Sequence, residues 1–501
     1  MTTLVSTSFP WLSLLLALPL LGALLCLAFR KQVDECKWFS LATTLLIFAV
    51  SIWMFFQGAD SNGWYFYEDY SWIERYGIRY TLGMDGISLL MIMLTGFLQV
   101  IAVAISWHQK KHAALFFALI LLLEAGIIGV FLALDLVLFY LFWEVMLIPM
   151  LFLIGVWGHG PRVYAAVKFF LFTLAGSLLM LVAIITLYLL HGQQSGDYSF
   201  ALQALKQTQL GSWEPWLFAG FMLAFLVKVP MVPLHTWLPD AHTVAPAAGS
   251  LDLAGLLLKT GVFGILRFAF PLFPAAANTS LPLIAILALA GLYHAAWVAY
   301  RQTDIKRLIA YSSVSHLGVV MLGVASGNAI ALEGSILLMV CHGVTTGALF
   351  GMVSMIRRRT GTRELEKLGG MWKETPVLAA FFLYFSLASL GLPGLANFAG
   401  EILVFLGTFQ VAPVWASLAL GGVVFAAAYM LRMIQGVIWG ERPEGREWPD
   451  LTWREVLSLI PLAVATLWLG VYPGPLLAHL QVPVHLILEQ GQILLSMGGV
   501  P

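Results

Sequence analysis

The chain has 501 residues, of which 60% are hydrophobic and only 10% are charged, and its formal net charge is zero. Soluble domains carry about 25% charged residues, so this composition excludes a water-soluble globular protein. The balanced charge provides no excess of positive charge for binding nucleic acid, so no nucleic-acid partner is expected. Three cysteines, Cys26, Cys36 and Cys341, are too few for a disulfide framework or an iron–sulfur cluster, and we expect no cofactor in this chain.

Apolar runs recur along the whole chain, and each is long enough to cross a hydrocarbon core of about 30 Å. They predict an all-α, polytopic membrane protein with about 14 transmembrane helices, organised as a single membrane domain over residues 1–501. The seventh, eighth and twelfth spans are the least regular. The predicted spans are residues 11–29, 38–57, 83–107, 114–132, 134–157, 166–190, 215–235, 246–270, 282–300, 308–325, 330–355, 376–407, 412–437 and 454–473.

The basic residues provide an independent test of this count. The first span ends on Arg30 and Lys31, which favours an N-terminus outside, and most of the 26 basic residues then fall on the inner side. Few basic residues fall in the outer segments. This asymmetry obeys the positive-inside rule, and with an even number of spans it predicts that both termini lie outside, which is the periplasm for a protein of the bacterial inner membrane. The inner residues are Arg30, Lys31, Lys37, Lys110, Lys111, Arg162, Lys168, Arg301, Lys306, Arg307, Arg357, Arg358, Arg359, Arg363, Lys367, Lys373, Arg442, Arg446 and Arg454. The outer residues are Arg75, Arg79, Lys206 and Arg267.

Four charged residues lie inside predicted spans, with apolar sequence on both sides: Glu144, Lys228, Lys259 and Glu401. A charged side chain at the centre of a membrane helix costs about 2.5–3.5 kcal/mol on insertion scales. Such residues can serve as packing contacts, for example a buried ion pair between Glu144 and Lys228. Four of them together favour an ion or proton path instead, since burial disfavours the charged form and allows proton exchange near neutral pH.

Histidines accompany these charges. His316 and His342 fall within spans ten and eleven, and the pKa of histidine lies nearest physiological pH, which suits a proton relay. Each could instead bond a hydroxyl or a backbone carbonyl. His235, Asp240 and His242 cluster beside the seventh span, but their spacing is weak evidence for a metal, and no metal site is expected. The sequence assigns no role to Glu124, Asp135, Asp252 and Glu333.

Two spans carry helix-breaking residues beside a buried charge. Pro230 and Pro233 follow Lys228, and each removes a backbone donor, so the carbonyls near Leu226 and Val229 need other partners. The sequence Gly-Leu-Pro-Gly at 391–394 precedes Glu401 in the same way. The pattern predicts that helices seven and twelve are discontinuous.

Interrupted helices beside buried charges are typical of transporters built from inverted repeats. Spans four to eight and nine to thirteen would form two such units, because an odd number of spans inverts the second unit. We therefore predict two inverted five-helix repeats, over residues 114–270 and 282–437.

Several segments resemble the antiporter-type subunits of respiratory complex I, the proton-translocating NADH:quinone oxidoreductase, a family related to the Mrp antiporters. The resemblance covers most of the chain, from about residue 80 to residue 440. Within the family, the form WEVMLIPM, the glutamate of span twelve, the length and the short segment after residue 473 resemble subunit M. The segments are LFWEVMLIPMLFLIGVWG (141–158), KVPMVPLHTWLPDAHTVAPAAGS (228–250), LDLAGLLLKTGVFGILRF (251–268), DIKRLIAYSSVSHLGVV (304–320) and GLPGLANFAGE (391–401). One departure is APAAG at 245–249, where the family more often has APTAG.

The resemblance implies roles for individual residues. Glu144 and Lys228 match a controlling pair, Lys259 matches a central lysine and Glu401 an exit group. His316 and His342 match a polar axis along the membrane. The resemblance also implies a hetero-oligomer with neighbouring antiporter-like subunits in the bilayer, and redox centres held by other subunits.

Other functions stay open at the level of sequence. A subunit of a multi-subunit Na+/H+ antiporter, of a related hydrogenase or of a bicarbonate-uptake complex would share the fold and much of the motif set. A purely structural membrane anchor is disfavoured by four buried charges beside two helix breaks. The sequence does not decide between H+ and Na+.

Overall fold

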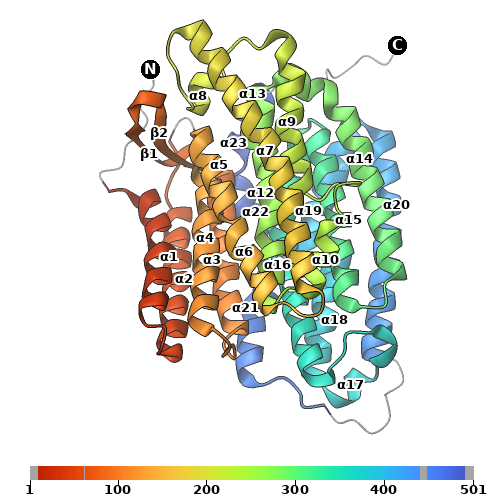
Figure 1. Cartoon of the computed structure of the whole chain (residues 1–501). Helices are drawn as coiled ribbons and strands as arrows, with labels where there is room; N and C mark the ends of the chain where they lie inside the picture. The colour runs from red at the N-terminus through yellow and green to blue at the C-terminus, as the bar shows by residue number, and fades with distance from the viewer. Residues whose placement is uncertain (1–8, 61–62, 440–447, 491–501) are drawn as a thin grey trace.

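The computed structural model describes residues 9–60, 63–439 and 448–490, so the predicted inner residues Arg442 and Arg446 lie outside the described residues. The described chain folds into one bundle of steeply inclined helices (Figure 1). In this part of the chain, twelve helices are long and apolar enough to cross a membrane. They are Trp11–Ala28 (α1), Val33–Phe55 (α2), Gly86–Ile105 (α3), Ala113–Leu132 (α4), Leu136–Trp157 (α5 and α6), Arg162–Ser195 (α7), Ala247–Leu272 (α11 to α13), Pro274–Arg301 (α14), Ile305–Ala325 (α15), Ala329–Thr360 (α16), Pro413–Trp439 (α20 and η6) and Trp453–Val471 (α21).

The other two predicted spans fall on interrupted helices, as their proline and glycine content predicts. The seventh, predicted over 215–235, falls on α9 (Glu214–Lys228) and the break that follows it, and α10 (Trp237–Val244) begins after the predicted span ends. The twelfth consists of α18 (Pro376–Leu390) and α19 (Ala396–Val411). The predicted mostly helical membrane fold is confirmed, whereas the repeats over 114–270 and 282–437 stay a prediction. Short helical elements complete the fold: η1 (Glu74–Tyr76), α8 (Leu202–Leu205), η2 (Gly211–Trp213), η5 (Leu365–Lys367), α17 (Met371–Glu374), α22 (Gly474–Ala478) and α23 (Gln481–Gln490).

A β-hairpin, which an all-α prediction does not include, precedes α3. Strands β1 (Trp64–Ile73) and β2 (Ile78–Asp85) pair antiparallel, and Gly77 closes the turn with a φ of 65°. Helix α3 begins at Gly86, with Asp85 as its N-cap, close to the predicted start of the third span at residue 83. The aromatic run of β1 has high strand propensity, a signal that a hydropathy reading overlooks.

Two further irregularities lie inside predicted spans. The fifth span is interrupted at Met146, between α5 (Leu136–Val145) and α6 (Leu147–Trp157), where Pro149 provides no N–H for the carbonyl four residues earlier. The eighth span contains two π-helical turns. Its elements are α11 (Ala247–Asp252), η3 (Leu253–Leu257), α12 (Leu258–Gly264), η4 (Ile265–Ala269) and α13 (Phe270–Leu272).

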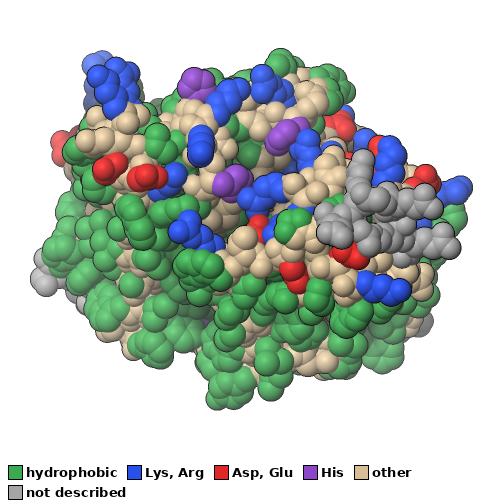
Figure 2. Space-filling model, turned by 90° about the horizontal axis from the view of Figure 1, so that it is seen from below, with side chains coloured by type: hydrophobic (Ala, Val, Ile, Leu, Met, Phe, Trp, Pro, Cys, Tyr) green, Lys and Arg blue, Asp and Glu red, His purple; other side chains and the backbone are tan. Residues whose placement is uncertain are grey.

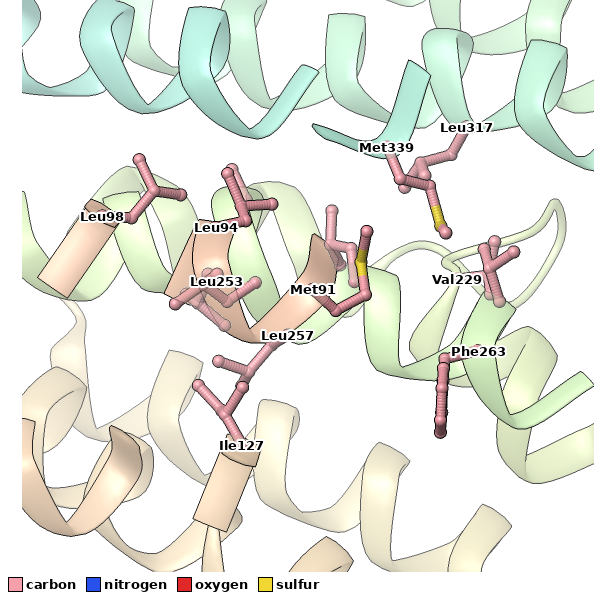
Figure 3. Packing of buried hydrophobic residues seen from close by; sticks show 14 of the residues in the cluster. Met91, Leu94, Leu98, Ile127, Val229, Leu253, Leu257, Phe263, Leu317 and Met339 are labelled. Carbon is pink, nitrogen blue, oxygen red and sulfur yellow. The ribbon is translucent and has the colours of Figure 1, made fainter. Parts of the chain in front are cut away.

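The eighth predicted span, α15 and α16 form the centre of the bundle and are almost wholly buried, whereas α1, α2 and α21 are far more exposed. Apolar side chains fill the space between helices (Figure 3). Leu94 and Leu98 of α3 meet Leu253 of η3, and Leu317 of α15 lies beside Met339 of α16. The polar residues of these central helices are therefore shielded from solvent and lipid.

Basic side chains gather on the lower end of the bundle (Figure 2). The hydrophobic sides of the molecule surround this patch, as expected for a protein whose flanks face lipid. We call this end the basic face; it includes the loops 106–112, 158–161, 302–304 and 361–370. The start of helix α1 and the short helix α23 lie toward the opposite end of the bundle (Figure 1).

Candidate functional site

Four of the six predicted site residues form a continuous chain of contacts through the centre of the bundle. The Lys259 Nζ lies 2.9 Å from His342 Nδ1. The rings of His342 and His316 lie side by side, with centroids 5.7 Å apart. The Nδ1 of His316 in turn lies 3.1 Å from Glu401 Oε1. Helices α12, α16, α15 and α19 each contribute one residue to this Lys–His–His–Glu chain.

A π-helical turn positions the lysine at the start of this chain. Lys259 follows η3, and its ammonium donates a hydrogen bond to the carbonyl of Ala254 within that turn. A π-turn disturbs the regular i to i−4 bonding of a helix and often occurs at a functional site. Here the lysine side chain provides a partner for a carbonyl of the irregular turn.

The glutamate at the far end lies against the break between α18 and α19. A Cβ atom at Gly391 would lie 2.7 Å from Glu401 Oε2, and Gly391 has a φ of 87°, so glycine is required on both grounds. Asn397, one turn before Glu401, accepts a hydrogen bond of 3.0 Å from Thr345 of α16. Sequence reasoning missed Asn397, although it belongs to the GLPGLANFAGE segment.

The other two predicted residues, Glu144 and Lys228, are near each other but do not form an ion pair. Lys228 is fully buried, and its Nζ has no hydrogen-bond partner among the residues that the structure describes. It lies instead over aromatic rings, 5.1 Å from the centroid of Trp143 and 5.9 Å from that of Phe169. Glu144 is within electrostatic range of the ammonium. The buried ion pair considered from the sequence is therefore absent from this arrangement of the two side chains.

The proline break after Lys228 is closed by local bonds. The Leu226 carbonyl accepts from the Met231 amide at 3.0 Å, and the Val227 carbonyl accepts from the Trp237 indole at 2.9 Å. The need for partners predicted near Leu226 is confirmed, and the Trp237 contact ties α10 back to α9. Helix α9 also packs closely on α12, since a Cβ at Gly261 would lie 3.1 Å from the Lys228 Cβ.

His235, Asp240 and His242, the three residues considered as metal ligands, each contact different neighbours. Asp240 forms an ion pair of 2.7 Å with Lys168, and the His235 ring packs against His294. His242 is fully buried and stacks on Phe350, and neither of its ring nitrogens has a hydrogen-bond partner in the described part of the chain. His242 also lies within electrostatic range of Lys259, so it adjoins the Lys–His–His–Glu chain. Sequence reasoning did not place it there.

Each residue of the Lys–His–His–Glu chain can gain and lose a proton, and some of its nitrogen atoms make no hydrogen bond among the described residues. The Nε2 atoms of His316 and His342 are buried without a partner among the described residues. Buried polar atoms of this kind are costly unless water or a transferred proton reaches them. A helix bundle with interrupted helices beside buried ionisable groups is typical of ion-transporting membrane proteins.

Comparison with known proteins agrees with this class. Residues 133–426 match the family described as NADH:quinone oxidoreductase/Mrp antiporter, TM. The chain is 45% identical to NADH-quinone oxidoreductase subunit M of Pseudomonas aeruginosa, over 93% of this chain and 95% of that protein. A chain of respiratory complex I from Thermus thermophilus superposes with a TM-score of 0.85 at 32% identity, covering 96% of this chain and all of that one. A chain of the Mrp complex from Dietzia shares the fold, with a TM-score of 0.84 at 21% identity, covering 97% of this chain and 99% of that chain.

The chain therefore belongs to the NADH:quinone oxidoreductase/Mrp antiporter family of membrane proteins, and within that family it groups with subunit M of NADH-quinone oxidoreductase.

Proposed function

We propose that this chain is a proton-translocating subunit of an NADH-quinone oxidoreductase and holds no redox centre itself. It lies in the bacterial inner membrane with the basic face toward the cytoplasm and the opposite end toward the periplasm. It works in a hetero-oligomer with other membrane subunits, as its relatives in complex I do. NADH oxidation and quinone reduction take place in other subunits, and no cofactor or metal is bound here.

The continuous contact chain from Lys259 through His342 and His316 to Glu401 is the observation that supports this proposal most directly. Each neighbouring pair lies within contact distance, and the four residues come from four different helices. Proton transfer needs donor and acceptor within hydrogen-bond reach, directly or through one water. The Lys259–His342 and His316–Glu401 pairs meet that requirement directly. Water completes the step between the two histidine rings.

The six residues take distinct roles on this proposal. Glu144 sets the charge state of Lys228, because an opposite charge nearby favours the protonated lysine. Lys228 passes that electrostatic change to the neighbouring α12, which carries Lys259. His342 and His316 relay the proton, and Glu401 releases it beside the break at Gly391. Coupling to redox chemistry requires that two states of the subunit bind the proton differently.

A subunit of a multi-subunit Na+/H+ antiporter is the alternative with a specific observation behind it, the shared fold with the Mrp complex. At 21% identity that likeness supports the fold alone. The 45% identity to subunit M over 93% of the chain favours the oxidoreductase.

Proton pumping by membrane vesicles tests the proposal. Inverted vesicles containing the assembled complex are supplied with NADH, and acidification of the lumen is compared between wild type and Lys259→Ala. The matched control is Thr260→Val, since Thr260 is the next buried residue and bonds only the Leu257 carbonyl of its own helix. NADH oxidation by an artificial acceptor verifies assembly.

We expect Lys259→Ala to lower the pumping rate by about a hundredfold, the usual size of a lost acid–base group, while Thr260→Val pumps normally. Normal pumping by Lys259→Ala in an assembled complex would refute the proposed path. Replacing sodium with potassium in the buffer separates the alternative, because a sodium antiporter would lose its activity and a proton pump would not.

A further inference from the structure

A second group of buried polar residues lies apart from the Lys–His–His–Glu chain. Gln99 of α3, Glu124 of α4 and Asp252 of α11 are all fully buried. Helix α3 packs against both α4 and α11, so the three side chains come from one junction of helices. The path described above uses none of them.

The contacts within this junction leave most of its oxygen atoms without partners. The Gln99 amide donates to Asp252 Oδ1 at 3.3 Å. Asp252 Oδ2, Gln99 Oε1 and both carboxylate oxygens of Glu124 have no hydrogen-bond partner among the described residues. Asp252 is the charged group whose field acts on Glu124. No Lys, Arg or His forms an ion pair with either carboxylate in the described chain.

Two neighbouring carboxylates in a dry interior do not both stay ionised without a cation. At least one proton must therefore reside on the pair, and its titration belongs to both residues together. A purely structural role accounts poorly for the arrangement, because buried polar groups normally have all their hydrogen bonds satisfied. The unpartnered amide oxygen of Gln99 can accept a hydrogen bond from a further polar species beside the pair.

The three residues lie at different depths below the basic face. Asp252 lies about 8 Å along the helix from Ala247, and Gln99 about 9 Å from Ile105, both measured from the basic face. Glu124 lies deeper, about 17 Å from Ala113, which is close to the depth of Lys259. One turn beyond Glu124, Ile127 packs against Leu257 (Figure 3). An apolar contact thus lies beyond the site, on the side away from the basic face.

We propose that Gln99, Asp252 and Glu124 form a proton-binding site that loads from the basic face and supplies the central lysine. The Asp252 carboxylate takes a proton from a hydronium ion that enters from the basic face: an O–H bond of the hydronium ion breaks and leaves water, and the carboxylic acid O–H bond of Asp252 forms. That bond then breaks as the proton passes through water to an oxygen of Glu124, which makes no direct hydrogen bond to Asp252 among the described residues. Water next carries the proton across the contact between α4 and α12 to the neutral amine of Lys259, and the pair regains its charge. The inference rests on the proposed function, since it assigns the residues that load the same path.

Isosteric substitutions in the assembled complex test the site. Glu124→Gln and Asp252→Asn keep the shape and remove the exchangeable proton. Glu333→Gln is the matched control, because Glu333 is a half-buried membrane glutamate on α16 that the path does not use. The pumping rate of inverted vesicles with NADH is measured from about pH 6 to about pH 8, a range over which proton supply falls a hundredfold. NADH oxidation by an artificial acceptor verifies assembly.

Both isosteric variants should pump about tenfold more slowly than wild type at the alkaline end and recover toward wild type at the acid end. Their pH profiles should therefore shift to lower pH, an effect that a lost packing contact does not produce. A profile that coincides with wild type, or a loss of equal size at every pH, overturns the site. If Lys259→Ala stops pumping while both variants pump normally, only this inference fails. If Lys259→Ala also pumps normally, the proposed function fails with it.

Discussion

His342 holds the middle of the proposed path, between the Lys259 ammonium and the His316 ring. His342→Phe keeps a planar ring of similar size but removes both nitrogens, so the relay is cut while packing is kept. We expect NADH-driven proton pumping to fall by about tenfold to a hundredfold. Vesicle acidification measures the effect, with assembly verified by NADH oxidation.

The control for this substitution is His191→Phe. His191 bonds Thr208 near the end of α7, at 2.9 Å, and has no contact with the path. Loss of pumping in both variants would point to general damage by the change of residue type. Normal pumping by His342→Phe would remove that residue from the path.

Asp135 has a structural role at the residue scale, in the short connection between α4 and α5. It caps α5 by accepting from the Val137 and Leu138 amides, and burial raises its pKa from 3.8 to about 6. The folded chain therefore holds this proton more tightly than the unfolded chain does. Its contribution to the free energy of unfolding, on the order of 3 kcal/mol at acid pH, is lost as pH rises from about 4 to about 6.

Asp135→Asn should remove this pH-dependent contribution while keeping a cap, since asparagine caps helices about as well as aspartate. We expect the gain in melting temperature on going from about pH 7 to about pH 5 to shrink in the variant. Thermal unfolding of the detergent-solubilised protein at the two pH values measures this. An unchanged difference between them would show that Asp135 does not titrate in this range.

At the scale of elements, each interrupted helix brings a backbone break beside an ionisable side chain. The two glycines of the 391–394 break allow a matched comparison. Gly391 and Gly394 have φ values of 87° and 88°, so alanine at either costs about 1 kcal/mol or more in backbone strain. Only Gly391 faces Glu401, whose Oε2 would lie 2.7 Å from the added Cβ, whereas nothing lies within 4 Å at Gly394.

Gly391→Ala and Gly394→Ala should therefore lose similar stability to backbone strain, and Gly391→Ala should lose more in total because its added Cβ also crowds Glu401. Gly391→Ala should also displace the Glu401 carboxylate from His316 and lower proton pumping, whereas Gly394→Ala should pump like wild type. Thermal unfolding and vesicle acidification separate the two effects. Equal pumping rates in the two variants would show that crowding Glu401 from position 391 does not affect proton pumping.

At the scale of the whole molecule, the orientation of the bundle follows from its basic face. Gly196 at the end of α7 and Gly361 at the end of α16 both lie in open space with φ near 75°, and they fall at opposite ends of the bundle. The three native cysteines are buried, so single cysteines at these glycines can be labelled selectively.

A membrane-impermeant thiol reagent should label Gly361→Cys in inverted vesicles and Gly196→Cys in right-side-out vesicles. The reason is that the basic face is expected on the cytoplasmic side. Unsubstituted protein supplies the background. If each cysteine is labelled from the opposite side, the protein has the inverse orientation in the membrane. If both cysteines are labelled from the same side, the proposed arrangement of the helices is wrong.

Local features of the sequence predicted the membrane class, most span boundaries and both interrupted helices. Hydropathy over a window of residues is a property of the chain itself, and a proline lacks its N–H in any fold. The charges within the spans, Glu144, Lys228, Lys259 and Glu401, were visible for the same reason, since each lies in an apolar run. Hydropathy did not predict the hairpin of β1 and β2, because its signal lies in the strand propensity of the aromatic residues of β1.

Partnerships between distant residues depended on the tertiary structure. Lys259 meets His342 rather than a carboxylate, Lys228 lies over Trp143 rather than against Glu144, and Gln99 reaches Asp252. Membrane helices that are apolar on all sides carry no amphipathic pattern to fix their rotation about their own axes. The π-turns of the eighth span and the break at Met146 rotate side chains further. The sequence by itself thus determined which residues could carry protons, and only the packing of helices decided which of them touch.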